Sequence, residues 1–176
     1  MIRRNLLCVL SCFGLMATVC VAQSGDGAES EGAKAITRFR VPPGMEVTLF
    51  AEEPMLANPV AIDVDHQGRV YVAETYRQET EGVPDNRSHR YWTEDDLRLQ
   101  TAEERGQMYL KYHPEYATEW TDQVDRIVRL VDSDGDGKAD VSGVFATGFQ
   151  DLLDGTGAGV LARGNEVWYT CIPNLS

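Results

Sequence analysis

Four aspartates alternate with other residues within one short stretch of the chain. Asp132, Asp134, Asp136 and Asp140 hold positions 1, 3, 5 and 9 of an EF-hand-like loop, with Lys138 at position 7. Calcium is a hard cation that takes roughly six to eight oxygen ligands at about 2.3–2.6 Å, and position 7 of such loops supplies a backbone carbonyl. The spacing therefore predicts a calcium site formed by the four carboxylates and the Lys138 carbonyl.

The same stretch departs from an EF-hand in two ways. Position 12 is Gly143, where that motif has a bidentate Glu. The flanking residues, 125–131 and 141–146, are rich in β-branched and aromatic side chains, so the loop is expected to close a β-hairpin. The alternative is an Asx-stabilised turn that binds no ion. Four carboxylates this close repel one another unless a cation lies among them, which favours the calcium site.

The first 22 residues have the features of a secretory signal peptide. Arg3 and Arg4 form a basic start, residues 6–21 are mostly apolar, and small residues allow cleavage before Gln23. We therefore expect an exported protein, periplasmic or extracellular. The apolar run is short for a membrane span, which needs about 20 residues. An uncleaved anchor or a lipidated cysteine remains the alternative, and either would give membrane association.

The cysteine content and the net charge of the chain indicate which bonds and which classes of partner it can form. Three of the four cysteines lie within the signal, so the mature chain keeps Cys171 alone, which is expected to be a buried small side chain. Cleavage removes two of the 16 basic residues and none of the 28 acidic ones, which leaves 14 against 28 and a formal charge of −14. Such an acidic chain is expected to avoid nucleic acid and anionic membranes.

The remaining sequence predicts an all-β fold. Residues 23–37 are small, polar and glycine-rich, as in a flexible linker. A strand is expected at residues 47–49, and a hairpin turns at Asp65–Gly68. A second hairpin within residues 157–170 repeats the pattern of the first. A repeated hairpin unit indicates a β-propeller, so residues 38–176 are predicted to form the N-terminal part, about two blades, of a propeller domain.

Residues 77–122 interrupt this repeat and are predicted to form a helical insertion. Thr93–Asp96 and Thr101–Glu104 are both candidate capping boxes. The second should begin a helix from Ala102 to about Tyr112, which Pro114 prevents from continuing. Aromatic residues in the insertion are expected to dock it on the blades.

Several stretches together carry a family resemblance: residues 39–47, Gly68–Arg77, Asp125–Asp140 and Val167–Asn174. With them the chain resembles the PVC-type membrane-bound dehydrogenases, a bacterial family of exported propellers similar to the soluble glucose/sorbosone dehydrogenases. The resemblance covers residues 38–176. It implies a six-bladed type of propeller with a calcium-supported hairpin, pyrroloquinoline quinone as cofactor, and a haem c domain further along the chain in many members. None of the family's catalytic residues can be placed on this sequence.

Other residues able to do chemistry have plainer explanations. His66 is expected to be a solvated turn residue, and His113 to interact with a helix end. His89 has basic neighbours that would suit an anionic ligand, although a solvated loop is favoured. Glu74 and Arg77 follow a predicted inner strand and could face a central cleft or form hydrogen bonds between blades.

The leading functional hypothesis is an N-terminal fragment of an exported quinoprotein-like dehydrogenase acting on a sugar or alcohol. Calcium would support one hairpin, electrons would pass to a haem c domain beyond these residues, and the 176 residues alone would be inactive. The alternatives are a non-enzymatic propeller that binds glycan or protein, and a calcium-dependent lactonase-type hydrolase. The catalytic and cofactor-binding residues stay unassigned.

Overall fold

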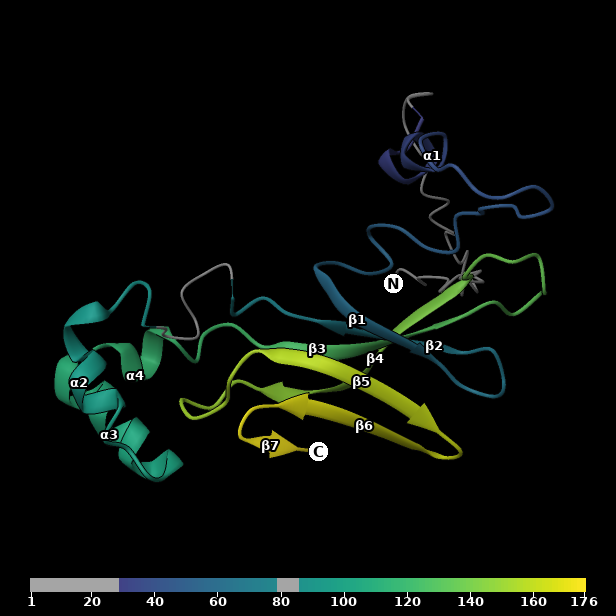
Figure 1. The fold of residues 1–176 in the computed structure, drawn as a ribbon. Helices are drawn as coiled ribbons and strands as arrows, with labels where there is room; N and C mark the ends of the chain where they lie inside the picture. Colours follow the sequence, from purple (N-terminus) through teal and green to yellow (C-terminus); the bar gives the residue numbers. More distant parts are fainter. Residues whose placement is uncertain (1–28, 79–85) are drawn as a thin grey trace, which may run out of the picture.

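The computed structural model describes residues 29–78 and 86–176, so the predicted signal peptide and the first part of the predicted linker lie outside the described residues. Its strands form two antiparallel sheets, and the chain is an all-β protein with a few short helices (Figure 1). The first sheet has the order β1-β2-β3-β4, with strands Pro59–Val64, Val70–Glu74, Asp125–Val131 and Val141–Phe149. The second has the order β5-β6-β7, with strands Gly157–Arg163, Glu166–Cys171 and Asn174–Leu175.

All three predicted hairpins are confirmed. The β1–β2 turn forms because Asp65 accepts hydrogen bonds from the backbone N–H groups of Gln67 and Arg69, at 2.9 and 3.0 Å. Gly68 takes a φ of 78°, which only glycine adopts without strain. Each strand then pairs with its neighbour in sequence, and the β2–β3 pair joins strands that the insertion separates along the chain.

The two sheets pack face to face around one apolar core. Tyr71, Ala73 and Ile127 of the first sheet meet Ala162 and Tyr169 of the second. A side chain also links β1 to β5, since the carboxylate of Asp63 accepts the Ala162 N–H at 2.7 Å. The first strands of the two sheets therefore lie against each other.

The other face of the first sheet is covered in part by an extended segment, residues 50–56. Phe50 and Met55 pack on Val72, Val128 and Leu130. The strand predicted at residues 47–49 is not formed, and this prediction was wrong. The backbone crosses the sheet face and is held by single bonds, such as Ala139 N–H to Phe50 C=O at 2.8 Å, so no ladder develops.

Between β2 and β3 the chain makes the predicted helical insertion, with a 3₁₀ turn η1 (Arg90–Trp92) and helices α2 (Thr93–Asp96), α3 (Ala102–Tyr112) and α4 (Tyr116–Glu119). The capping box at Thr101 and Glu104 is confirmed, with both reciprocal hydrogen bonds present. The one at Thr93 is wrong, because its hydroxyl donates to the Arg90 carbonyl and Trp92 occupies the N-cap position instead.

The insertion has its own core and extends from one end of the sheets (Figure 1). Its buried residues are Trp92, Met108, Tyr109 and Trp120. Leu153, from the β4–β5 connection, fits against α3 at Gly106, where an added Cβ would lie 2.8 Å from the Leu153 Cδ2 atom.

A short helix, α1 (Glu31–Ile36), lies inside the segment predicted to be a flexible linker. Ser30 caps it by accepting the Ala33 N–H, and the Gly32 N–H donates to Glu52 at 3.1 Å. These contacts order a stretch whose composition alone predicted a flexible linker. Among the described residues, the helices are too short or too polar to cross a membrane.

Candidate metal site in the β3–β4 loop

Strands β3 and β4 hold the aspartate-rich loop as predicted. Their pairing ends at Val131 and Val141, and the loop spans the residues between. Gly135 and Gly137 have φ values of 81° and 86°, so both glycines make the left-handed turns that curl the loop. Gly143 lies inside β4 opposite Arg129, which removes position 12 from the loop.

Three of the predicted ligands converge. Asp132, Asp134 and Asp136 each offer a carboxylate oxygen, and these oxygens all lie within 4.8 Å of one another. Two oxygens bound to one calcium ion at about 2.3–2.6 Å can be at most about 5 Å apart. The separations of the three carboxylates are therefore compatible with ligands that share a single cation of this size.

The same carboxylates also organise the loop backbone. Asp132 accepts the N–H groups of Gly135 and Gly137, at 2.7 and 2.9 Å. Asp134 accepts the Asp136 N–H, and Asp136 accepts the Lys138 N–H. A carboxylate oxygen has lone pairs left after one such bond, so these contacts shape the loop and are compatible with a bound ion.

Asp140 does not join the cluster. Its Oδ2 atom accepts both the N–H and the hydroxyl of Ser133, at 2.8 Å each. The Ser133 bonds lower the pKa of Asp140 below its ordinary value. In this arrangement Asp140 links the two ends of the loop by hydrogen bonds. That the Lys138 carbonyl is a calcium ligand stays a prediction.

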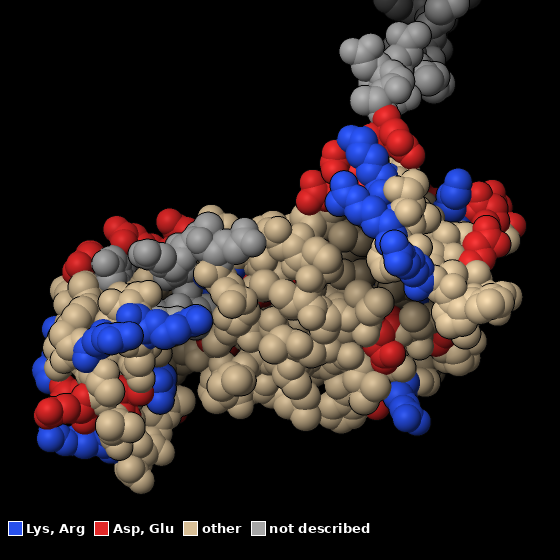
Figure 2. All heavy atoms as spheres, turned by 45° about the horizontal axis from the view of Figure 1, so that its top comes forward, with Lys and Arg blue, Asp and Glu red and all other residues tan. Residues whose placement is uncertain are grey.

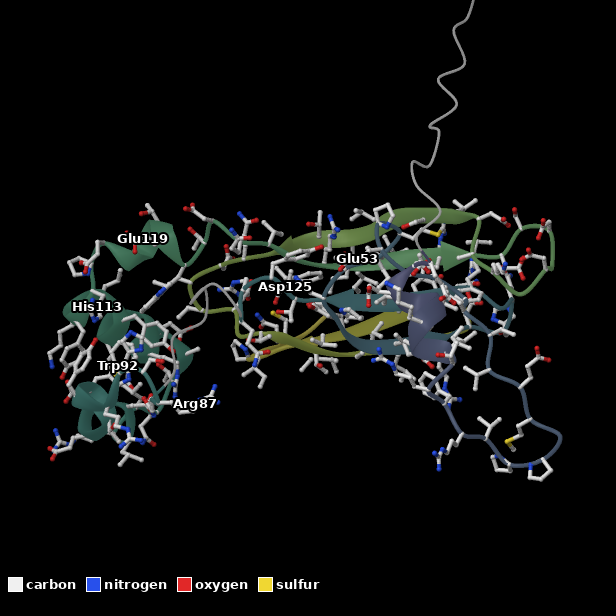
Figure 3. All side chains as sticks on the ribbon, turned by 90° about the horizontal axis from the view of Figure 1, so that it is seen from above. Glu53, Arg87, Trp92, His113, Glu119 and Asp125 are labelled. Atoms are coloured by element: carbon white, nitrogen blue, oxygen red, sulfur yellow. The ribbon has the colours of Figure 1, made fainter. Side chains whose placement is uncertain are left out.

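A second group of charged residues is buried at the other end of the sheets, next to the insertion. Asp125 accepts four bonds: one from the Thr75 hydroxyl and three from the N–H groups of Tyr76, Arg77 and Gly157. Figure 3 shows Asp125 at the junction between the strands and the helical region. No sequence pattern pointed to Asp125, because its partners lie 32–50 residues away along the chain.

Arg77 and Glu74 are both buried and engaged in contacts, Arg77 with the connection between the two sheets and Glu74 within the first sheet and its covering segment. Arg77 is fully buried and donates to the carbonyls of Asp151, Asp154 and Gly155 at 2.8–3.1 Å. Glu74 accepts the Ala57 N–H at 2.7 Å and pairs with Arg126 at 2.6 Å. Both side chains are fixed by these contacts.

Two of the three histidines are neighbours, since the ring centres of His89 and His113 lie 5.6 Å apart in an edge-to-face contact. His66 is exposed in the β1–β2 turn, as predicted. His113 follows α3 and bonds to Tyr91 and Glu115. For His89 the expectation of a solvated loop was wrong, since its ring is buried and stacks on Trp92 with the ring centres 4.3 Å apart.

Cys171 is buried and unbridged, as expected. Burial raises the pKa of its thiol to about 11, and its Sγ lies 3.2 Å from the Gly155 carbonyl. The thiolate, which is the reactive form, is therefore scarce at neutral pH, and Cys171 is unsuited to act as a nucleophile.

Comparison with protein families identifies a matching family. Residues 31–157 match the family described as "Domain of unknown function (DUF7133)". The chain belongs to this family. Searches of curated proteins and of solved structures found no match. The DUF7133 region spans α1, the first sheet, the insertion and the aspartate loop, so the candidate metal site lies within it.

Proposed function

We propose that this DUF7133 chain is a β-propeller segment whose β3–β4 loop binds calcium as a structural ion. The convergence of three carboxylates within 4.8 Å carries the proposal. Asp134 and Asp136 are exposed, and the loop lies at the end of the sheet away from the insertion (Figure 1). Such a peripheral position favours a stabilising ion over a catalytic one, which argues against the lactonase alternative.

Calcium would supply positive charge among carboxylates that otherwise repel one another. The loop is joined to the covering segment by the Ala139–Phe50 backbone bond, so an ordered loop also supports that segment. Asp132, Asp134 and Asp136 would provide side-chain oxygens, with water completing the shell.

The calcium proposal is tested by thermal melts in calcium, in magnesium and in a chelator. Calcium should raise the melting temperature more than magnesium does, because magnesium prefers a smaller octahedral shell. Asp134→Asn should remove most of the calcium-dependent shift, since one charge of three is lost. Asp122→Asn, an exposed aspartate outside the loop, is the matched control. A calcium shift that persists unchanged in Asp134→Asn would refute the site.

The propeller part of the proposal is supported by the way the two sheets stack. Each sheet begins with the strand nearest the other sheet, and β1 and β5 are joined through Asp63 and Ala162. Successive antiparallel sheets packed in this way are the arrangement of propeller blades. The outer faces of both sheets also carry exposed apolar side chains, which blade neighbours would cover.

The resemblance to exported dehydrogenases extends the proposal to oxidation of a sugar or alcohol with pyrroloquinoline quinone, in a chain that continues into a haem c domain. The test is reduction of an electron-accepting dye by a chain carrying the remaining blades, supplied with quinone, calcium and a panel of sugars. Absence of turnover, with glycan or protein binding retained, would select the non-enzymatic alternative.

A further inference from the structure

A hollow of about 540 Å³ lies between helix α3 and the β4–β5 connection, at the insertion end of the sheets. Ala102, Arg105 and Tyr109 line one side, and residues 152–156 line the other. Sites for small molecules commonly measure about 300–1,000 Å³. The hollow is therefore large enough for a small organic ligand.

The wall formed by the β4–β5 connection is held from behind by buried charged groups. Arg77 donates to carbonyls of Asp151, Asp154 and Gly155. Asp125 accepts the Gly157 N–H at 3.0 Å, where the connection enters β5. A loop fixed through its own carbonyls and N–H keeps its shape when empty, which lowers the cost of binding.

The α3 wall is equally well fixed. The helix starts at a complete capping box, and Tyr109 lies in the aromatic core of the insertion. Gly106 lets α3 approach Leu153 closely, so helix and connection touch at one point beside the hollow. Both walls are thus parts of ordered structure.

The lining combines apolar side chains with one guanidinium. The apolar part comes from Leu152, Leu153, Ile172 and Pro173, and the only cation lining the hollow within the described part of the chain is Arg105. Its Nη1 atom lies 2.7 Å from Asp96, and it also bonds to Tyr109. A guanidinium has five N–H donors, more than these two partners use.

Asp154, the acidic residue in the lining, has a carboxylate that is already engaged in hydrogen bonds. Asp154 directs its carboxylate to its own loop, where it accepts the Asp151 N–H at 3.0 Å and lies 3.5 Å from the Asn174 amide nitrogen. Arg105 therefore lines a mostly apolar hollow and has N–H donors beyond those that Asp96 and Tyr109 use. That pairing suits a ligand with an apolar body that ends in a charged acceptor.

We propose that this hollow binds a small carboxylate with an apolar body, whose carboxylate is held by Arg105. The apolar part lies between Leu152, Leu153 and Pro173. This site is independent of the proposed calcium loop, which closes the opposite end of the first sheet (Figure 1).

Calorimetric titration of the purified chain with 4-phenylbutyrate and with 4-phenylbutan-1-ol tests the proposal, because the two probes share one apolar body. The acid should bind saturably and at least about tenfold more tightly than the alcohol, since only it makes charge-assisted bonds to Arg105. Arg105→Gln should reduce that preference to near one. Arg163→Gln, an exposed arginine at the far end of β5, should leave it unchanged.

A second variant guards against loss of folding in Arg105→Gln, which also breaks the contact with Asp96. Ala158 is exposed and lines the hollow, so Ala158→Leu should fill the space with an unchanged melting temperature. It should abolish binding of both probes. The proposal is overturned if 4-phenylbutyrate shows no saturable binding, if acid and alcohol bind equally to the wild type, or if Ala158→Leu binds as the wild type does.

Discussion

Asp65 is a buried carboxylate whose partners belong mostly to its own turn. It accepts two backbone N–H groups, from Gln67 and Arg69, and pairs with the Arg69 Nε at 2.5 Å. Burial alone would raise the pKa of Asp65. The bonds from Gln67 and Arg69 outweigh burial and hold the pKa below its ordinary value of 3.8.

A pKa that is lower in the folded chain than in the unfolded chain makes the carboxylate stabilising above about pH 4, and this contribution is lost as the pH falls through the folded value. Asp65→Asn should therefore lower the free energy of unfolding at pH 7 by about 1–2 kcal/mol, through weaker hydrogen bonds. The difference from the wild type should shrink below the folded pKa. Thermal melts from pH 7 down to about pH 3 measure it, with Asp122→Asn as the control; a gap independent of pH would contradict the assignment.

At the scale of elements, the contact between β5 and β6 depends on a glycine, Gly157, which has no side chain. Gly157 pairs with Cys171, and a Cβ added at Gly157 would lie 1.5 Å from the Tyr169 hydroxyl. Tyr169 is 1% exposed, and its hydroxyl has no hydrogen-bond partner among the described residues. Burial raises the pKa of Tyr169, so the hydroxyl stays neutral. The tyrosine ring fills the space that a larger residue at 157 would need.

Gly157→Ala should lower the free energy of unfolding by about 1–3 kcal/mol or more through overpacking. Tyr169→Leu should relieve most of that cost in the double variant. Tyr169→Phe alone should be neutral or stabilising, because a buried hydroxyl without a partner costs about 1–3 kcal/mol. Chemical denaturation of the wild type, Gly157→Ala, Tyr169→Leu and the double variant completes the double-mutant cycle. Gly143→Ala, where a Cβ meets open space, is the control; additive single effects would show that the two positions do not touch.

The elements that the sequence predicted correctly depend on neighbours within a few residues. The β1–β2 turn, the capping box at Thr101 and the curl at Gly135 and Gly137 are all local arrangements. The clustering of Asp132, Asp134 and Asp136 follows from that curl, so this part of the candidate site was predictable too.

The elements that were missed depend on contacts distant in sequence. Alternating residues at 47–49 suggested a strand, but the chain that follows them, from Phe50, crosses a sheet face formed by β2 and β3. Helix α1 is held by Glu52, and His89 is buried by the insertion's own aromatic residues. The hollow beside Arg105 forms only when α3 meets the β4–β5 connection, and composition or spacing cannot reveal such a meeting.

At the scale of the whole molecule, one face separates charged from uncharged side chains. Figure 2 shows a broad expanse with few charged side chains over the strands, and charged groups gathered over the insertion and near α1. On β1, Ile62 is 66% exposed, between the exposed Val60 and Val64. On the far sheet, Leu161 and Trp168 are paired with each other and exposed by 47% and 43%. Apolar patches of this kind mark surfaces that another layer covers.

If the two sheets are propeller blades, these outer faces are the ones that neighbouring blades cover, and a chain of only these 176 residues should associate through them. Sedimentation velocity should show species larger than a monomer that grow with concentration. Leu161→Glu with Trp168→Glu should weaken the association at least about tenfold, because the charges would have to be desolvated at the contact. Leu97→Glu, an exposed leucine on the insertion, should leave it unchanged. A wild-type chain that stays monomeric at every concentration would remove this support for the blade arrangement, while leaving the calcium loop and the hollow beside Arg105 to be judged by their own tests.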